Sequence, residues 1–176
     1  MQILFIPKPL AIILCFILWP VIQIGAAVVC HNLPERFLSY SSPFYRSYGW
    51  EKRGEIYRRI FRVHKWKRLL PDSADFIKGN YRKKSLEGIS KESLKKHLLE
   101  SCRAEMTHWL AIPFFWVFGL FSPPRVILYM LMYAIAVNLP CIITLRYNRP
   151  RIVKLLDKLE HHRGTKEERQ NEMERF

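Results

Sequence analysis

Residues 126–151 read VILYMLMYAIAVNLPCIITLRYNRPR, a run of twenty residues without a charged side chain that ends abruptly in three arginines. A hydrocarbon core about 30 Å thick requires about 20 apolar residues in a helix, so this run predicts a transmembrane span. Arg146, Arg149 and Arg151 then fall where hydrocarbon gives way to headgroups. They act there either as topological anchors or as the polar wall of an interfacial site.

Two further apolar stretches precede this run. Pro9 to Val29 is long enough for a span, and residues 106–121 form a shorter one. A turn-forming cluster of Gly, Ser, Pro and Arg over residues 119–125 separates 106–121 from 126–145, and a single helix could not absorb it. We therefore expect an all-α integral membrane protein with about three transmembrane helices, the last two joined as a hairpin.

The charges are strongly segregated, although 176 residues with a net charge of +14 would otherwise suit a soluble basic protein. Lys and Arg outnumber Asp and Glu by eighteen to nine in residues 32–105 and by nine to six in residues 146–176. The positive-inside rule places both segments in the cytoplasm, in a multi-pass cell-membrane protein. The expected organisation is an N-terminal transmembrane helix (1–30), a basic cytoplasmic or interfacial segment (31–105), a transmembrane hairpin (106–145) and a basic amphipathic tail (146–176).

The first segment has an alternative interpretation as a cleaved signal peptide, with a short basic start and Gly25-Ala26-Ala27 as the cleavage site. Its apolar stretch is long for a signal peptide. Cleavage would also place the basic middle segment outside the cell.

The middle segment interleaves aromatic and basic side chains over residues 43–70, and Ile56, Ile60 and Val63 recur at helical spacing. This pattern predicts a helix in the membrane interface. It would also suit single-stranded nucleic acid, but a membrane-tethered chain favours lipid headgroups. We expect membrane lipids as partners and no nucleic acid.

Three other elements are predicted from local signals. Residues 71–86 are polar and expected to form a solvated loop, after which Ser90 is the N-cap of a helix that runs into the second span. After Pro150 a new helix is expected, with an interfacial apolar face and a frayed, charged end beyond Gly164.

Glu105 and His108 stand three residues apart at the start of the second span, on one face of a helix. A carboxylate beside an imidazole can hold it in one tautomer and raise its basicity, as a general base for a hydroxyl nucleophile requires. The alternative is a pair that satisfies itself at the membrane boundary. The four cysteines have no metal-binding spacing and the Glu-x-x-His pair is only half of a di-iron motif, so no metal site is expected.

Asn138 lies inside the third span, two residues before Pro140. Its amide could meet backbone groups that the proline frees, or it could hydrogen-bond a substrate. The arginines that follow could clamp a phosphate or polarise a thioester, because a guanidinium offers forked donors. The Gly-x-Ser-x-Gly, phosphate-loop and His-x-x-x-x-Asp signatures of common hydrolases and acyltransferases are absent from the sequence.

Three islands together carry a resemblance to a known family: residues 64–72 (HKWKRLLPD), residues 103–109 (RAEMTHW), and Asn138-Leu139-Pro140 with residues 146–151. In order and approximate spacing they resemble the glycosyl-4,4'-diaponeurosporenoate acyltransferases, small membrane proteins of the bacterial C30 carotenoid pathway. The resemblance runs from about Asn32 to about Leu159.

The resemblance implies transfer of a fatty acyl chain to the C6'' hydroxyl of the glucose of glycosyl-4,4'-diaponeurosporenoate, the last step towards staphyloxanthin. The expected partners are this glycosylated carotenoid acceptor and an acyl-thioester donor, either acyl-CoA or acyl-carrier protein, with no other cofactor. We expect His108, oriented by Glu105, to be the catalytic base. The residues expected to bind acceptor or donor are Asn138, Arg146, Asn148, Arg149, Arg151, Lys65, Trp66, Lys67, Arg103 and Trp109.

Two other functions fit the same residues. One is acylation of another glycolipid or polar lipid, since a fold does not fix its acceptor. The other is a non-catalytic membrane protein that binds lipids or organises a biosynthetic complex through its basic aromatic segment.

Overall fold

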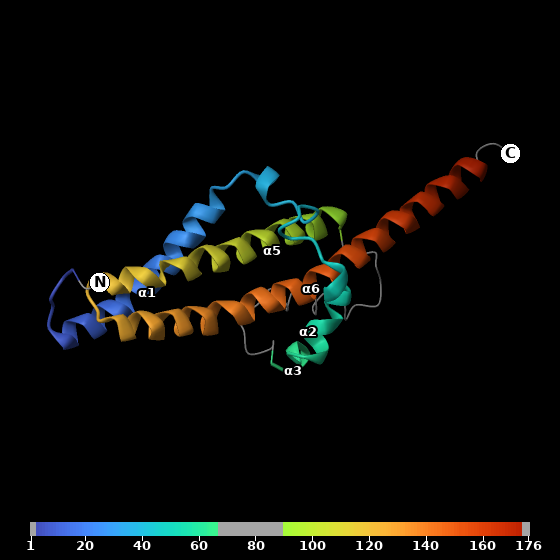
Figure 1. Ribbon diagram of the computed structural model, residues 1–176. Coiled ribbons are helices and arrows are strands. Elements are labelled where there is room, and N and C mark those ends of the chain that lie inside the picture. The colour runs from blue at the N-terminus through green and yellow to red at the C-terminus, as the bar shows by residue number, and fades with distance from the viewer. Residues whose placement is uncertain (1–2, 67–89, 174–176) are drawn as a thin grey trace. The chain divides into compact units, whose positions relative to one another are not determined.

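The computed structural model describes residues 3–66 and 90–173, and every regular element in these ranges is a helix (Figure 1). The all-α class predicted from the sequence is thereby confirmed, whereas Lys67 and the loop expected over 71–86 lie outside the described residues. The chain divides into two compact units. Unit 1 comprises Met1–Tyr45 and Ser101–Leu145, and unit 2 comprises Arg46–Glu100 and Arg146–Phe176.

Unit 1 is built from three helical segments around an aromatic core. They are α1 (Lys8–His31), the end of α5 (Lys91–Ala111) with the 3₁₀ helix η5 (Ile112–Leu120), and the start of α6 (Pro124–Met173). The buried Trp19 of α1 has its ring centroid 6.1 Å from that of Phe118 in η5 and 5.3 Å from that of Tyr133 in α6. A single side chain of α1 therefore joins all three segments.

The chain turns between η5 and α6, at the Ser-Pro-Pro cluster where the sequence predicts it. The α-helical part before the turn ends at Ala111, because Pro113 has no N–H to donate and its ring clashes with the preceding turn. Gly119 lies within η5 rather than in the turn. A Cβ there would come 2.5 Å from Cδ1 of Ile127, so its lack of a side chain permits close packing of η5 on α6.

Within residues 3–66 and 90–173, two helices are long and apolar enough to cross a membrane: α1 and the apolar part of α6. Both expose large apolar side chains, among them Phe16, Ile24, Leu128 and Met132. The expected span over 106–121 does not meet the same criterion, because it is divided between the end of α5 and η5.

Unit 2 buries two apolar helix faces against each other. Leu94 and Leu98 of α5 form a core with Ile152 and Leu156 of α6. Part of the apolar face expected after Pro150 thus packs on α5, and its placement in the membrane interface stays a prediction. The N-cap prediction is confirmed, because Ser93 N–H donates to Ser90 Oγ over 3.0 Å.

The segment expected to form one interfacial helix is instead broken into short pieces. They are the 3₁₀ helix η2 (Gly49–Gly54), α2 (Glu55–Arg59) and α3 (Val63–Trp66), following the 3₁₀ helix η1 (Glu35–Phe37) of unit 1. Arg62, between α2 and α3, has a φ of 47°, which no α-helix accommodates. The periodicity of Ile56, Ile60 and Val63 was therefore misleading.

The helix expected to begin at Pro150 is also wrong, because α6 runs through this proline without a break and continues to Met173 (Figure 1). Pro150 removes one backbone hydrogen bond, to the carbonyl four residues earlier. Burial of Ile152 and Leu156 one to two turns later helps hold the helix together. The frayed end expected beyond Gly164 is helical instead, as far as Met173.

Candidate active site

A cluster of three polar side chains joins the helices of unit 1. The Asn138 Oδ1 of α6 accepts a hydrogen bond from Gln23 Nε2 of α1 over 3.2 Å, and it lies 2.8 Å from His108 Nδ1 of α5. Asn138 is fully buried, and its Nδ2 donates to the carbonyl of Ala134 over 2.9 Å. One amide therefore engages the other two polar side chains and its own helix.

These contacts determine the tautomer of His108. Two hydrogen bonds set the orientation of the Asn138 amide: its Nδ2 donates to the Ala134 carbonyl, and its Oδ1 accepts from Gln23 Nε2. Its Oδ1 then faces His108 and can only accept, so the proton of a neutral imidazole resides on Nδ1. Nε2 keeps its lone pair, as a general base requires.

This geometry decides between the two roles considered for Asn138. Pro140 frees the carbonyl of Ala136, four residues earlier, whereas the Asn138 amide donates to Ala134. Asn138 thus does not repair the backbone at the proline. It holds a histidine instead, which the sequence analysis did not consider.

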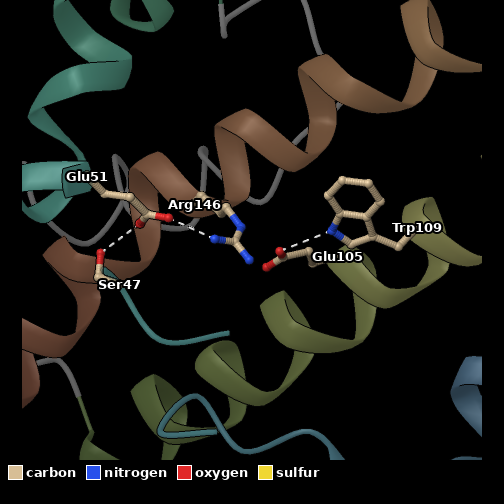
Figure 2. Close-up of polar contacts among 5 residues, drawn as sticks. All are labelled: Ser47, Glu51, Glu105, Trp109 and Arg146. Carbon is tan, nitrogen blue, oxygen red and sulfur yellow. Dashed lines mark hydrogen bonds and ion pairs between the residues drawn. The ribbon is translucent and has the colours of Figure 1, made fainter. Parts of the chain in front are cut away.

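The partner expected for His108 is different in the structure. Among the described residues, His108 hydrogen-bonds Asn138 and not Glu105. The buried Glu105 accepts from Trp109 Nε1 over 3.3 Å, one turn further along α5 (Figure 2). Spacing by three residues placed Glu105 and His108 on one helix face, but the packing of α6 supplied a nearer acceptor.

The first arginine after the apolar run forms a buried ion pair in unit 2. Arg146 Nη1 lies 2.7 Å from Glu51 Oε1, and the side chain of Glu51 is 1% exposed (Figure 2). Ser47 Oγ donates to the other carboxylate oxygen over 3.0 Å. Burial, followed by the charge of Glu51, raises the pKa of the neighbouring Tyr57 to about 12. Arg146 is therefore paired with protein rather than presented to solvent.

The remaining predicted binding residues differ in accessibility. Asn148 and Arg149 are buried, and the guanidinium of Arg151 stacks 3.5 Å from the ring centroid of Tyr147 and also donates to the Tyr147 carbonyl. Trp66 Nε1 donates to the carbonyl of Phe61 over 2.6 Å. The side chains with exposed or partly exposed surface are Lys65, Trp66, Arg103, Trp109 and Arg151.

No group of three or more His, Cys, Asp or Glu side chains that could hold a metal ion occurs in residues 3–66 and 90–173. The chemistry open to the cluster of unit 1 is proton transfer through His108 Nε2.

Comparison with known proteins identifies the family. The sequence profile described as glycosyl-4,4'-diaponeurosporenoate acyltransferase matches residues 41–158. The chain belongs to this family. A glycosyl-4,4'-diaponeurosporenoate acyltransferase of Staphylococcus haemolyticus is 34% identical over 135 residues, which cover 76% of this chain and 78% of the relative. One of Staphylococcus aureus (strain MRSA252) is 32% identical over 143 residues, covering 81% and 86%.

No solved structure matches this acyltransferase. The family match includes His108, Asn138 and Arg149, whereas Gln23 lies before its first residue. Sequence reasoning missed three polar residues of these clusters, namely Gln23, Ser47 and Glu51. Gln23 could have been noticed as an isolated amide in a long apolar run, but nothing in the sequence pairs Glu51 with an arginine 95 residues away.

Proposed function

We propose that this acyltransferase esterifies the C6'' hydroxyl of the glucose of glycosyl-4,4'-diaponeurosporenoate with a fatty acyl chain, and that His108 is the general base. The observation that carries the proposal is the hydrogen bond between His108 Nδ1 and the buried Asn138 Oδ1, which leaves Nε2 free to take a proton. The names of the relatives support the acceptor.

The reaction balances with these groups alone. His108 Nε2 accepts the proton of the sugar hydroxyl while the hydroxyl oxygen forms a bond to the thioester carbonyl carbon. The tetrahedral intermediate then collapses, the carbon–sulfur bond breaks, and the protonated imidazole returns the proton to the leaving thiolate. The products are the sugar ester and a free thiol, and neither a metal nor a redox cofactor takes part.

Glu105 and Trp109 form a second polar contact on α5. We assign Glu105 a positioning role, because its carboxylate holds the indole of Trp109 by a hydrogen bond. Trp109 is 39% exposed, which leaves ring surface for a sugar or a polyene to pack on. Trp66 would serve the acceptor in the same way.

The protein is proposed to span the cell membrane three times, with its basic segments in the cytoplasm. Two helices pass the length and composition criterion, and their large exposed apolar side chains suit lipid better than water. Residues 106–111 in α5 followed by the nine residues of η5 rise about 27 Å, because a 3₁₀ helix rises about 2.0 Å per residue. That length is close to the ~30 Å of the hydrocarbon core, which supports η5 as part of a third span.

The acyl donor, acyl-CoA or acyl-carrier protein, is proposed to be held by the basic side chains of unit 2. Arg146 forms the ion pair with Glu51, so we propose Arg149, Arg151, Asn148, Lys65 and Lys67 of this unit for the phosphates, and Arg103 of unit 1 for the oxyanion. Replacing Arg149 by Lys should lower turnover at least tenfold if a forked contact matters. Unchanged turnover would support the anchor role instead.

Replacing His108 by Ala tests the proposal most directly. We expect ester formation from glycosyl-4,4'-diaponeurosporenoate and a long-chain acyl-CoA or acyl-carrier protein to fall by about 100-fold or more, since a general base contributes that much. His31→Ala is the matched control, because His31 is exposed at the end of α1 and outside the family match. Retention of full activity by His108→Ala, with membrane-inserted protein at the wild-type level, would remove His108 from the mechanism.

The identity of the acceptor is tested separately. Mass spectrometry of pigments and glycolipids from cells with and without the protein should show one species gaining a fatty acyl chain, the glycosylated carotenoid. Acylation of a different polar lipid would mean that the proposed acceptor is wrong and that the proposed acyl transfer is right. No acylated species at all would favour a non-catalytic lipid-binding role.

A further inference from the structure

Gln23 is the only member of the unit 1 polar cluster that lies outside the residues matched by the family. It sits on α1, among side chains that are otherwise apolar from Pro9 to Val29. Its Nε2 donates to Asn138 Oδ1, the same oxygen that faces His108 Nδ1. The first helix is thus connected to the catalytic histidine through a single amide oxygen.

The contact does not satisfy Gln23 itself. Its Oε1 is buried and has no hydrogen-bond partner among the described residues. A buried acceptor without a partner is unfavourable, so an apolar side chain of the same length would suit stability better at this position. Gln23 therefore calls for an explanation other than packing.

We propose that Gln23 is a positioning residue for the acyl transfer. Together with the Ala134 carbonyl it sets the orientation of the Asn138 amide, and through it the Nδ1–H tautomer of His108. This inference rests on the proposed role of His108 as the base. Under this proposal α1 contributes a residue to the active site and does not act only as a membrane anchor.

A direct consequence concerns the N-terminus. Removal of residues 1–27 as a signal peptide would delete Gln23 together with Trp19, which joins the segments of unit 1. The mature enzyme should therefore retain α1. Intact-mass measurement of the protein from its native membrane should give the full-length chain, and a mass that lacks residues 1–27 would overturn the proposal.

The decisive variant is Gln23→Met, which keeps the length of the side chain and removes its donor. Full-length protein in detergent, given glycosyl-4,4'-diaponeurosporenoate and a long-chain acyl-CoA or acyl-carrier protein, should lose about tenfold in kcat with little change in KM for the acceptor. Its thermal midpoint should be unchanged or raised, because the unpaired Oε1 is gone. Gln23→Asn, which is one methylene shorter and cannot reach Asn138, should lose kcat in the same way.

Trp19→Leu is the matched control on the same helix, since Trp19 packs against Phe118 and Tyr133 and takes no part in the hydrogen bonds of the polar cluster. It should lower the thermal midpoint and leave kcat of the folded protein near wild type. A Gln23→Met enzyme that behaves like Trp19→Leu would show a purely structural role and overturn the proposal.

A readout independent of turnover separates this inference from the proposed function. In ¹⁵N-histidine NMR spectra, with His108 assigned through His108→Ala, the wild type should show the Nδ1–H tautomer. Gln23→Met should show a mixture of tautomers. A wild-type pattern in Gln23→Met would refute the positioning role, even if the protein acylates a different acceptor.

Discussion

The two units each contain a buried polar cluster, but the clusters differ in charge. In unit 1 the Gln23 amide and the His108 imidazole both hydrogen-bond one oxygen, Oδ1 of Asn138. In unit 2 a carboxylate and a guanidinium form an ion pair, supported by a hydroxyl. An imidazole can accept and return a proton, as a general base does, whereas a buried ion pair is costly to separate. The difference supports the proposed chemistry in unit 1 and a structural role for Glu51 and Arg146 in unit 2.

Breaking the unit 1 cluster should have the largest effect on activity. Asn138→Leu removes the oxygen that selects the His108 tautomer, and kcat should fall by about 100-fold or more. Asn138→Asp is the matched control, because a carboxyl group protonated on the oxygen beside the Ala134 carbonyl can still donate there and accept from Gln23 and His108, and it should retain clearly more activity. Equal losses in the two variants, measured with purified enzyme, would argue against tautomer selection.

Breaking the unit 2 ion pair should affect stability more than chemistry. Glu51→Gln leaves the Arg146 charge without its carboxylate and should lower the free energy of unfolding by about 3 kcal/mol. The double variant Glu51→Gln, Arg146→Gln should recover part of this loss in a thermal double-mutant cycle. Glu55→Gln, which breaks the exposed Glu55–Arg58 pair at 3.2 Å, should cost less than about 1 kcal/mol.

The turn that follows Glu51 should be the next most sensitive feature of unit 2. Gly54 has a φ of 86°, and a Cβ there would lie 3.1 Å from the backbone oxygen of Tyr147. Gly54→Ala should therefore destabilise the protein by about 1–2 kcal/mol. Gly49→Ala, with no atom within 4 Å of the added Cβ and no positive φ, should be close to neutral in the same melting experiment.

The smallest expected effect is a change in the pH dependence of stability. Tyr57 has its pKa raised from 10.0 to about 12, mainly by burial and then by Glu51. As the pH rises, the Tyr57 hydroxyl loses its proton in the unfolded chain before it does so in the folded protein. The stability that protonated Tyr57 contributes is therefore complete below about pH 10 and is lost as the pH rises through about 12. Tyr57→Phe should flatten this part of the melting profile. A decline as steep as in the wild type would mean that other groups cause it.

Local signals in the sequence predicted the parts that depend on neighbours along the chain. Ser90 caps α5 because its hydroxyl reaches a backbone N–H three residues on, and the Ser-Pro-Pro cluster ends η5 because proline cannot continue a helix. The apolar run of α6 could likewise be predicted from the composition of that segment alone. His108 and Asn138 were both singled out, but as members of separate motifs.

What the sequence alone determined is the helical class, the apolar helices and the type of residue available for proton transfer. Only the tertiary structure decided which of these residues meet. Gln23 and Asn138 are 115 residues apart, and Glu51 and Arg146 are 95 apart. The same cause explains why His108 does not pair with Glu105. Asn138 of α6 supplies the acceptor for His108, and Glu105 accepts from Trp109. Helical spacing fixes which side chains share a face, whereas the choice of partner depends on which other face packs against it.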